Sequence, residues 1–178
     1  VTIARIGQKA ENIYFGKPSG LMDQTASSVG DTVAIDFENP EAPVVRPIEA
    51  NLEGLGLALC IIDCGADHAA LTGEYASIPQ EMCQVAAYFG KKVLREVKEA
   101  DVLANLPALR QKVGDRAVLR ALHFYADDQR AVEEADALAN GEKETFLNLV
   151  KESGRSSWEL LQNITPAAAV AHQDMAIA

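Results

Sequence analysis

Apolar side chains recur every three to four residues at the start of the chain. They are Ile3, Ile6, Ala10, Ile13 and Tyr14, with mainly charged or polar residues between them. This spacing places the apolar side chains on one face of an amphipathic helix, because an α-helix completes one turn in about 3.6 residues. The sequence therefore predicts a helix from Val1 to Tyr14, which begins without any helix-start signal before it.

A second, shorter helix is predicted over residues 19–30. Gly16 ends the first helical pattern, Ser19 can cap the next helix, and Gly30 stops it. Asp23 then lies in the first helical turn, where unpaired backbone N–H groups and the helix dipole favour an ionised carboxylate. Such a carboxylate is ready to accept a proton. An acidic residue in a first turn is also ordinary compensation of the dipole, so the spacing alone leaves both interpretations open.

Three apolar runs predict β-strands. Residues 32–37 and 44–48 form the first two, and Pro47 indicates an edge position for the second because proline cannot donate to a ladder. Residues 56–63 are almost continuously apolar, which is typical of a strand buried on both faces. The sequence therefore predicts a sheet as well as helices.

A loop at residues 51–54 is interpreted as a domain boundary, which gives domains of residues 1–53 and 54–178. After the third strand, the second domain continues with a helix that ends near Gly90 and is then entirely helical. The further helices are expected at residues 101–104, 109–126, 127–139, 142–152, 156–162 and from 167 onward. The predicted fold class is α+β with two domains.

Composition narrows the class of partner. The chain has 178 residues, of which 48% are hydrophobic and 24% charged, so it can bury a sizeable core. Its 26 acidic and 16 basic residues give a net charge of -10. A field of this sign repels nucleic acids and anionic membranes, and neither is expected as a partner.

The three cysteines, Cys60, Cys64 and Cys83, occur without a secretory signal or a long apolar span. We therefore expect buried thiols in a reducing cytoplasm and no disulfide framework. Cys60, Cys64 and His68 are residue types that bind zinc. Two residues four apart on a strand are separated by about 13 Å, however, at about 3.3 Å per residue. Zinc ligands bond at about 2.3 Å, so no metal site is expected.

Several motifs occur in the order of a known enzyme family. They are Ala10-Glu11-Asn12, Gly16, Pro18-Ser19-Gly20-Leu21-Met22-Asp23-Gln24, Asp36, Asp63-Cys64-Gly65 with His68, and Tyr75. In this order they resemble the galactokinases, which are GHMP small-molecule kinases, over nearly the whole chain. The chain departs from the family before His68 and after Tyr75, where the family commonly has arginine. These departures leave the sugar preference open.

The resemblance implies a two-domain GHMP kinase architecture. Residues 1–53 would form the end of a ribosomal-protein-S5-like N-terminal domain, and residues 54–178 most of a ferredoxin-like, helix-rich C-terminal domain. It also implies ATP and Mg²⁺ as cofactors and galactose as the substrate that is phosphorylated on its anomeric hydroxyl. Asp23 would be the catalytic base, and Gly20, Asp23 and Tyr75 would bind the sugar.

The residues that bind the nucleotide remain unknown, because the chain has no Gly-rich phosphate-binding run. The resemblance implies that this phosphate loop lies upstream of Val1, together with a sugar-binding Glu-His-x-Asp segment and a catalytic arginine. We therefore interpret the chain as an internal fragment that is inactive alone and self-associates through its exposed apolar face. The alternatives are a kinase for another hexose or an N-acetylated hexosamine, and a galactokinase-like sugar sensor without catalysis.

Overall fold

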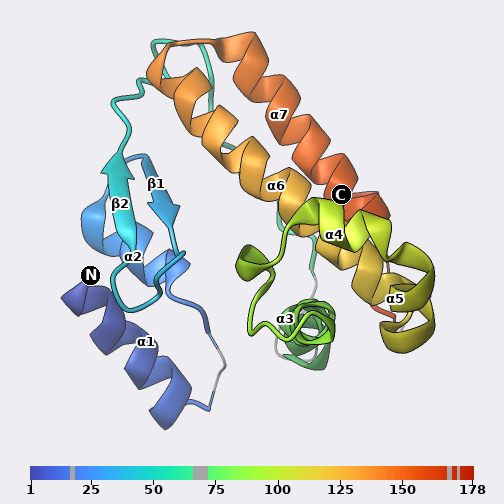
Figure 1. The fold of residues 1–178 in the computed structure, drawn as a ribbon. Coiled ribbons are helices and arrows are strands. Elements are labelled where there is room, and N and C mark those ends of the chain that lie inside the picture. The colour runs from blue at the N-terminus through green and yellow to red at the C-terminus, as the bar shows by residue number, and fades with distance from the viewer. Residues whose placement is uncertain (17–18, 66–71, 168–169, 172) are drawn as a thin grey trace. The chain divides into compact units, whose positions relative to one another are not determined.

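The structure, a computed structural model, describes residues 1–16, 19–65, 72–167, 170–171 and 173–178 (Figure 1). The chain divides into two compact units. The first comprises residues 1–57 and 131–146, and the second residues 58–130 and 147–178. The predicted domain boundary between residues 53 and 54 stays a prediction.

Four elements form the start of the first unit. They are α1 (Thr2–Tyr14), α2 (Met22–Val29), β1 (Val33–Asp36) and β2 (Val44–Pro47) (Figure 1). The hydrophobic pattern predicts all four, and the structure confirms them. β1 and β2 pair antiparallel and form a two-stranded sheet, in which Ile35 lies opposite Val45. The structure is thus rich in helices with a small sheet, which confirms the α+β class at that level.

Val1 lies just outside α1 and does not belong to the helix itself. It occupies the N-cap position, and its carbonyl oxygen accepts the backbone N–H of Arg5 at 3.0 Å. No side chain caps this end of the helix, in agreement with the missing start signal in the sequence. The helix thus begins at Thr2, one residue after the predicted start.

α1 packs on α2 through a face that is distinct from its apolar stripe. Ala4 of α1 and Thr25 of α2 are both buried. The stripe itself points away, and Ile3, Ile6 and Ile13 are 73%, 65% and 63% exposed. The amphipathic face predicted from the sequence therefore exists, and no other described residue covers it.

A small apolar cluster completes the first unit. Ile48, which follows β2, packs with Ala135 and Leu138 near the end of α6 (Asp115–Ala139). The side chains of Leu52, Leu55 and Phe146 are among those that partly cover the cluster. Arg46 of β2 adds an ion pair with Asp136 at 2.9 Å, which contributes little because both side chains are exposed.

The buried strand predicted over residues 56–63 is wrong for this structure. Residues 57–65 form neither helix nor strand, and Leu59 and Ile61 are 86% and 92% exposed. A strand requires a neighbour that accepts and donates its backbone hydrogen bonds. Within the described parts of the chain, only β1 and β2 form such a ladder. The segment therefore has the composition of a strand without a strand beside it.

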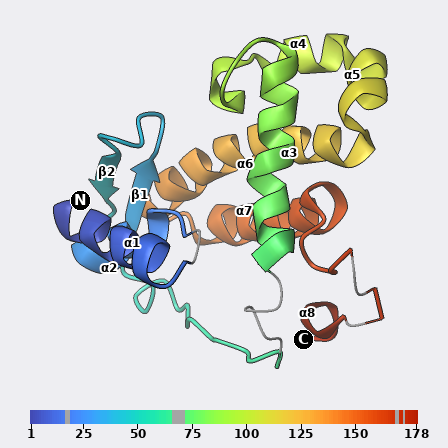
Figure 2. The same cartoon turned by 90° about the horizontal axis from the view of Figure 1, so that it is seen from below.

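The second unit is helical (Figure 2). Its elements are α3 (Thr72–Tyr88), a 3₁₀ turn (Leu94–Glu96), α4 (Glu99–Ala104), α5 (Leu106–Val113), most of α6, most of α7 (Lys143–Ser156), a π-helical turn (Ser157–Leu161) and α8 (Asp174–Ile177). No helix in the described ranges has the length and hydropathy needed to cross a bilayer.

The helix boundaries in this unit differ from the predicted ones at two places. Gly114, with φ of 88°, separates α5 from α6 inside the stretch predicted as one helix over residues 109–126. The break predicted at residues 126–127 is absent. Asp127 and Asp128 continue α6 and pair with Arg130 at 2.9 Å and Arg95 at 2.7 Å. By residue type alone, two aspartates suggest the start of a helix. Here both form ion pairs with arginines, and the helix continues through them.

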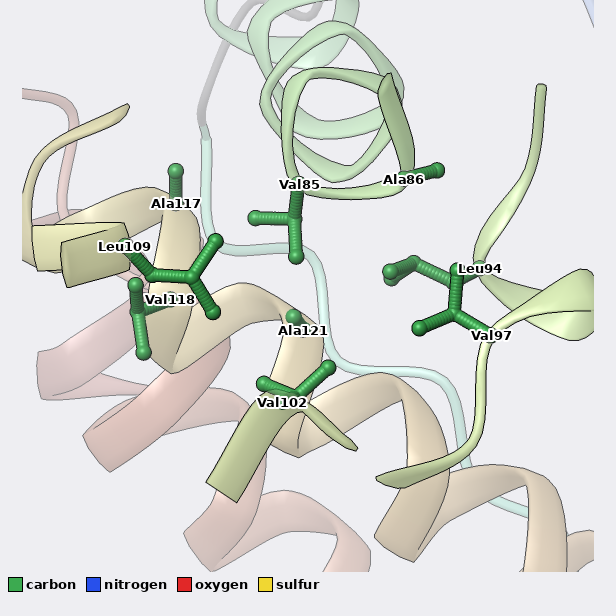
Figure 3. Packing of buried hydrophobic residues seen from close by; sticks show 9 residues of the cluster. All are labelled: Val85, Ala86, Leu94, Val97, Val102, Leu109, Ala117, Val118 and Ala121. Carbon is green, nitrogen blue, oxygen red and sulfur yellow. The ribbon is translucent and has the colours of Figure 1, made fainter. Parts of the chain in front are cut away.

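The core of the second unit lies where α3 meets α4, α5 and α6 (Figure 3). It contains Val85 and Ala86 of α3, Leu94 and Val97 at the 3₁₀ turn, Val102 of α4, Leu109 of α5, and Ala117, Val118 and Ala121 of α6. Small residues on α6 allow the neighbouring helices to approach closely, and the larger Leu109 and Val102 fill the space between them. This packing fixes the half of α3 that follows residue 81.

The expectation of buried thiols is wrong. Cys60 and Cys83 are exposed and Cys64 is partly exposed. Cys60 and Cys64 lie in the irregular segment that replaces the predicted strand. Cys83 lies two residues before Val85, which places it on the opposite side of α3 from the core.

His123 of α6 is a buried polar residue in the second unit. It is 6% exposed, and its Nδ1 lies 2.9 Å from the hydroxyl of Ser156. Its Nε2 lies 3.5 Å from a carboxylate oxygen of Asp127. Burial lowers the pKa of His123, the Asp127 carboxylate opposes this shift, and Arg130 adds to it.

This lowered pKa predicts a pH-dependent stability. As pH falls below the ordinary His pKa of 6.5, the unfolded chain takes up a proton before the folded one does, so folding weakens. We expect the wild-type chain to lose more unfolding free energy than His123→Gln between about pH 7.5 and pH 5.5. Urea unfolding followed by the fluorescence of Trp158, the single tryptophan, measures this difference. Equal losses in both proteins would show that the pKa of His123 is not depressed.

Candidate functional site

The loop between α1 and α2 is tied back to α1 by hydrogen bonds. The Oδ1 atom of Asn12 accepts hydrogen bonds from the backbone N–H of Ser19 at 2.9 Å and from its hydroxyl at 3.1 Å. The amide of Gln8 donates to the carbonyl oxygen of Ser19 at 3.3 Å. These three bonds fix the point at which the chain enters α2.

Asp23 lies in the first turn of α2, as the sequence predicts, and its side chain is exposed. The predicted cap is wrong, because Leu21 occupies the N-cap position and no side chain caps the helix. Ser19 lies three residues before Met22 and is engaged by Asn12 instead. The first-turn N–H groups of α2 therefore have no side-chain acceptor at the cap, which suits a nearby anionic group.

Gln24 fixes the rotation of α2 beside Asp23. Its Nε2 donates to Oε1 of Glu11 at 2.9 Å, while its Oε1 is buried and has no partner among the described residues. Successive residues of a helix point about 100° apart, so Gln24 faces α1 while Asp23 faces outward. The motifs include Glu11 and Gln24, but sequence reasoning missed their pairing.

Gly20 precedes α2 and is exposed. A Cβ atom added there would meet no atom of the described structure within 4 Å, and the residue has no positive φ that would require glycine. Neither packing nor backbone conformation within the described residues explains why glycine is present. A glycine can also serve where another molecule approaches the backbone closely.

Tyr75 lies in the second unit, near the start of α3, and is 48% exposed. The structure thus brings Gly20 and Asp23 together in the first unit, whereas Tyr75 belongs to the second. Asp36 ends β1, and the carboxylate of Asp63 accepts a hydrogen bond from the N–H of Gly65 at 2.8 Å, as in an ordinary Asx turn. His68 lies outside the described residues.

The described residues form no metal-binding cluster, and the predicted site residues do not line the pocket beside the end of α6. No three or more His, Cys, Asp or Glu side chains of the described chain gather where they could hold a metal ion. A shallow pocket of about 350 Å³ lies between the loop at residues 49–55 and the end of α6. None of Gly20, Asp23 and Tyr75 lines this pocket.

Comparisons with known proteins give one consistent result. The galactokinase of Actinobacillus pleuropneumoniae serotype 3 is 36% identical over 140 residues, which cover 76% of this chain and 34% of that protein. The galactokinase of Mannheimia succiniciproducens is 32% identical over 174 residues, covering 92% of this chain and 42% of that protein. The galactokinase of Streptomyces coelicolor is 32% identical over 142 residues, covering 79% and 36%. No protein-family model matches the chain.

These similarities confirm the resemblance to galactokinases that the motifs indicate. The chain spans between about a third and two fifths of the length of the curated relatives it matches. The roles of Gly20, Asp23 and Tyr75 remain predictions, and so does a phosphate loop upstream of Val1.

Proposed function

We propose, from the similarity of this chain to a segment of galactokinases, that the protein containing it phosphorylates galactose in the cytoplasm. The reaction transfers the γ-phosphoryl group of ATP to the anomeric hydroxyl of the sugar. The observation that carries the proposal is the position of Asp23, an exposed carboxylate in the first turn of a helix whose entry and rotation are both fixed.

Asp23 would accept the proton of the anomeric hydroxyl and orient its oxygen toward the phosphorus atom. The transition state of phosphoryl transfer is loose, so the protein contributes mainly by positioning and by neutralising charge. The bonds between Ser19 and Asn12 and between Gln24 and Glu11 support this role, because they hold the backbone of the catalytic turn before substrate arrives. Gly20 would leave room for the sugar beside that turn.

The described residues do not complete a Mg²⁺ site, because no three of their His, Cys, Asp or Glu side chains gather where they could hold a metal ion. A magnesium ion bound with a nucleotide takes one or two carboxylates together with phosphates and waters. Glu11 of α1 accepts a hydrogen bond from Gln24, whereas Asp23 faces away from α1 and is the proposed base. When bound, the ion would neutralise phosphate charge. The chain has no run that fits ATP itself, so no step is assigned to a nucleotide-binding residue.

The departures from the family near Tyr75 leave open which sugar the protein binds. The sequence Ala76-Ser77-Ile78-Pro79 follows Tyr75 where arginines are common in the family. A kinase for another hexose or for an N-acetylated hexosamine would use the same Asp23 chemistry. A sugar sensor would bind galactose without releasing ADP. An ADP-release assay over a panel of hexoses and N-acetylated hexosamines, together with galactose binding by calorimetry, separates these three functions.

The first prediction of this function concerns Asp23. In the protein encoded by the complete reading frame, we expect Asp23→Asn to lower kcat by about a hundredfold or more, because positioned general bases contribute about that much. Galactose binding should weaken far less, since asparagine keeps the shape and the hydrogen-bonding oxygen. Steady-state kinetics and calorimetry with galactose measure the two quantities. A kcat close to that of the wild type would remove Asp23 from the mechanism.

The second prediction concerns Tyr75. We expect Tyr75→Phe to raise the KM for galactose about fivefold with a smaller change in kcat, because one ground-state hydrogen bond contributes about 1 kcal/mol. Tyr88→Phe is a matched control, since Tyr88 lies at the other end of the same helix. If calorimetry found the same galactose affinity in Tyr75→Phe as in the wild type, Tyr75 would not contact the sugar.

The third prediction concerns the 178-residue chain alone. We expect no galactose-dependent ADP release from it, even when circular dichroism shows that its helices are folded. It contains the base but no phosphate-binding run, and orientation and charge stabilisation supply most of the acceleration in phosphoryl transfer. A coupled assay compares it with the protein from the complete reading frame. Turnover within about tenfold of that protein would refute this account.

A further inference from the structure

Arg120 of α6 is a charged side chain inside the second unit. It is 1% exposed and is the largest side chain among those fully buried in the described structure. Its Nε donates to the carbonyl oxygen of Leu161 at 3.0 Å. Its Nη1 donates to the hydroxyl of Ser77 at 2.9 Å and to Oε2 of Glu81 at 3.0 Å. One guanidinium therefore joins α3, α6 and the end of the π-helical turn.

The two partners of Arg120 on α3 lie on either side of a proline. Pro79 lies inside the helix, two residues after Ser77 and two before Glu81. A proline has no N–H group, so it cannot donate to the carbonyl four residues earlier, and that residue is Tyr75. Proline inside a helix also permits a kink at this point. The backbone thus links the turn carrying Tyr75 to the rest of α3 less firmly than in a regular helix.

The two halves of α3 are held by different interactions. After residue 81, Val85 and Ala86 pack into the apolar core (Figure 3). Before that point, the same helical stripe carries Glu74, Ser77 and Glu81. The hydroxyl of Ser77 donates to the carbonyl oxygen of Glu74 at 2.7 Å. A continuous set of hydrogen bonds therefore runs from Arg120 through Ser77 to the residue next to Tyr75.

The effect of burial on Arg120 is opposed by the nearby carboxylate of Glu81. Burial lowers the pKa of Arg120, Glu81 opposes this shift, and the nearby Arg116 adds to it, while Glu74 favours the charged form. Glu81 also accepts from Arg116 through a contact at 2.5 Å. Removing Arg120 therefore leaves Glu81 with a cationic partner and does not create an isolated buried carboxylate.

We propose that Arg120 is a positioning residue that spans the Pro79 interruption and sets the orientation of the α3 turn carrying Tyr75 for sugar binding. The proposal rests on the proposed function for its sugar-binding consequence. Its structural part is independent of that function. Arg120 acts through Ser77 and Glu81 and does not itself contact the substrate in this proposal.

The test compares two arginines in the protein from the complete reading frame. Arg120→Met removes the bonds on both sides of Pro79 but keeps a long side chain in the core. Arg116→Met is the matched control, because Arg116 lies one turn earlier on α6 and contacts the same Glu81 without reaching Ser77. Amide hydrogen exchange of residues 76–78 measures how firmly the turn is held, and residues 85–88 report on the other half of α3.

We expect Arg120→Met to speed exchange at residues 76–78 about tenfold, as the loss of a hydrogen bond to a charged group predicts. Exchange at residues 85–88 should change less than about twofold, and Arg116→Met should leave both regions within about twofold. The KM for galactose should rise about fivefold in Arg120→Met with kcat nearly unchanged. In a Pro79→Ala background, which restores the backbone hydrogen bond to Tyr75, both effects of Arg120→Met should shrink by about half or more.

Equal acceleration of exchange in both halves of α3 would overturn the proposal, since Arg120 would then be a general core residue. The proposal would also be overturned if Arg120→Met changed hydrogen exchange and the KM as much in the Pro79→Ala background as it does in the wild-type background. Faster exchange at residues 76–78 with an unchanged KM would overturn the link to the sugar. If the wild-type protein did not phosphorylate galactose, the proposed function would fail, while the exchange data would still decide whether Arg120 holds this turn.

Discussion

The burial of the Arg120 guanidinium constrains how three segments of the helical unit assemble. A buried charge costs several kcal/mol unless hydrogen bonds and an opposite charge compensate it. Here the compensation comes from Ser77 and Glu81 of α3 and from the carbonyl of Leu161, so three segments must assemble together. A buried ion pair of this kind adds little stability over an apolar replacement. We therefore assign stability and the placement of the second half of α3 mainly to the apolar core, and the placement of its first half mainly to Arg120.

Local signals explain how much of the candidate site could be predicted. The helix-forming pattern before Tyr14, the breaks near Gly16 and Gly30, and the position of Asp23 all depend on neighbours within one or two turns, and the structure confirms them. Ser19 fits an N-cap by residue type, but its actual partner is Asn12, seven residues earlier on another helix. Such a contact depends on how two helices pack, and sequence spacing does not contain that information.

The errors elsewhere share a physical cause. The apolar run at residues 56–63 has strand composition, but a strand exists only when another strand receives its hydrogen bonds, and none of the described residues does so. Asp127 resembles a helix start, because aspartate favours the N-cap. Its pairing with Arg130 and its proximity to His123 make it suitable for the middle of α6. In both cases the structure depends on whether a partner is present, which the local pattern does not reveal.

In the hairpin formed by α1 and α2, the hydrogen bonds that position Asp23 and the apolar stripe of α1 lie on different faces of α1. The bonds that hold Asp23 in place, between Ser19 and Asn12 and between Gln24 and Glu11, are polar and local to this hairpin. The stripe of Ile3, Ile6 and Ile13 faces the other way and is exposed among the described residues. Losing or gaining a partner for that stripe would change the stability of the hairpin, at about 25 cal/mol per Å² of apolar surface. The hydrogen bonds around Asp23 do not involve that stripe, so they do not depend directly on whether the stripe is covered.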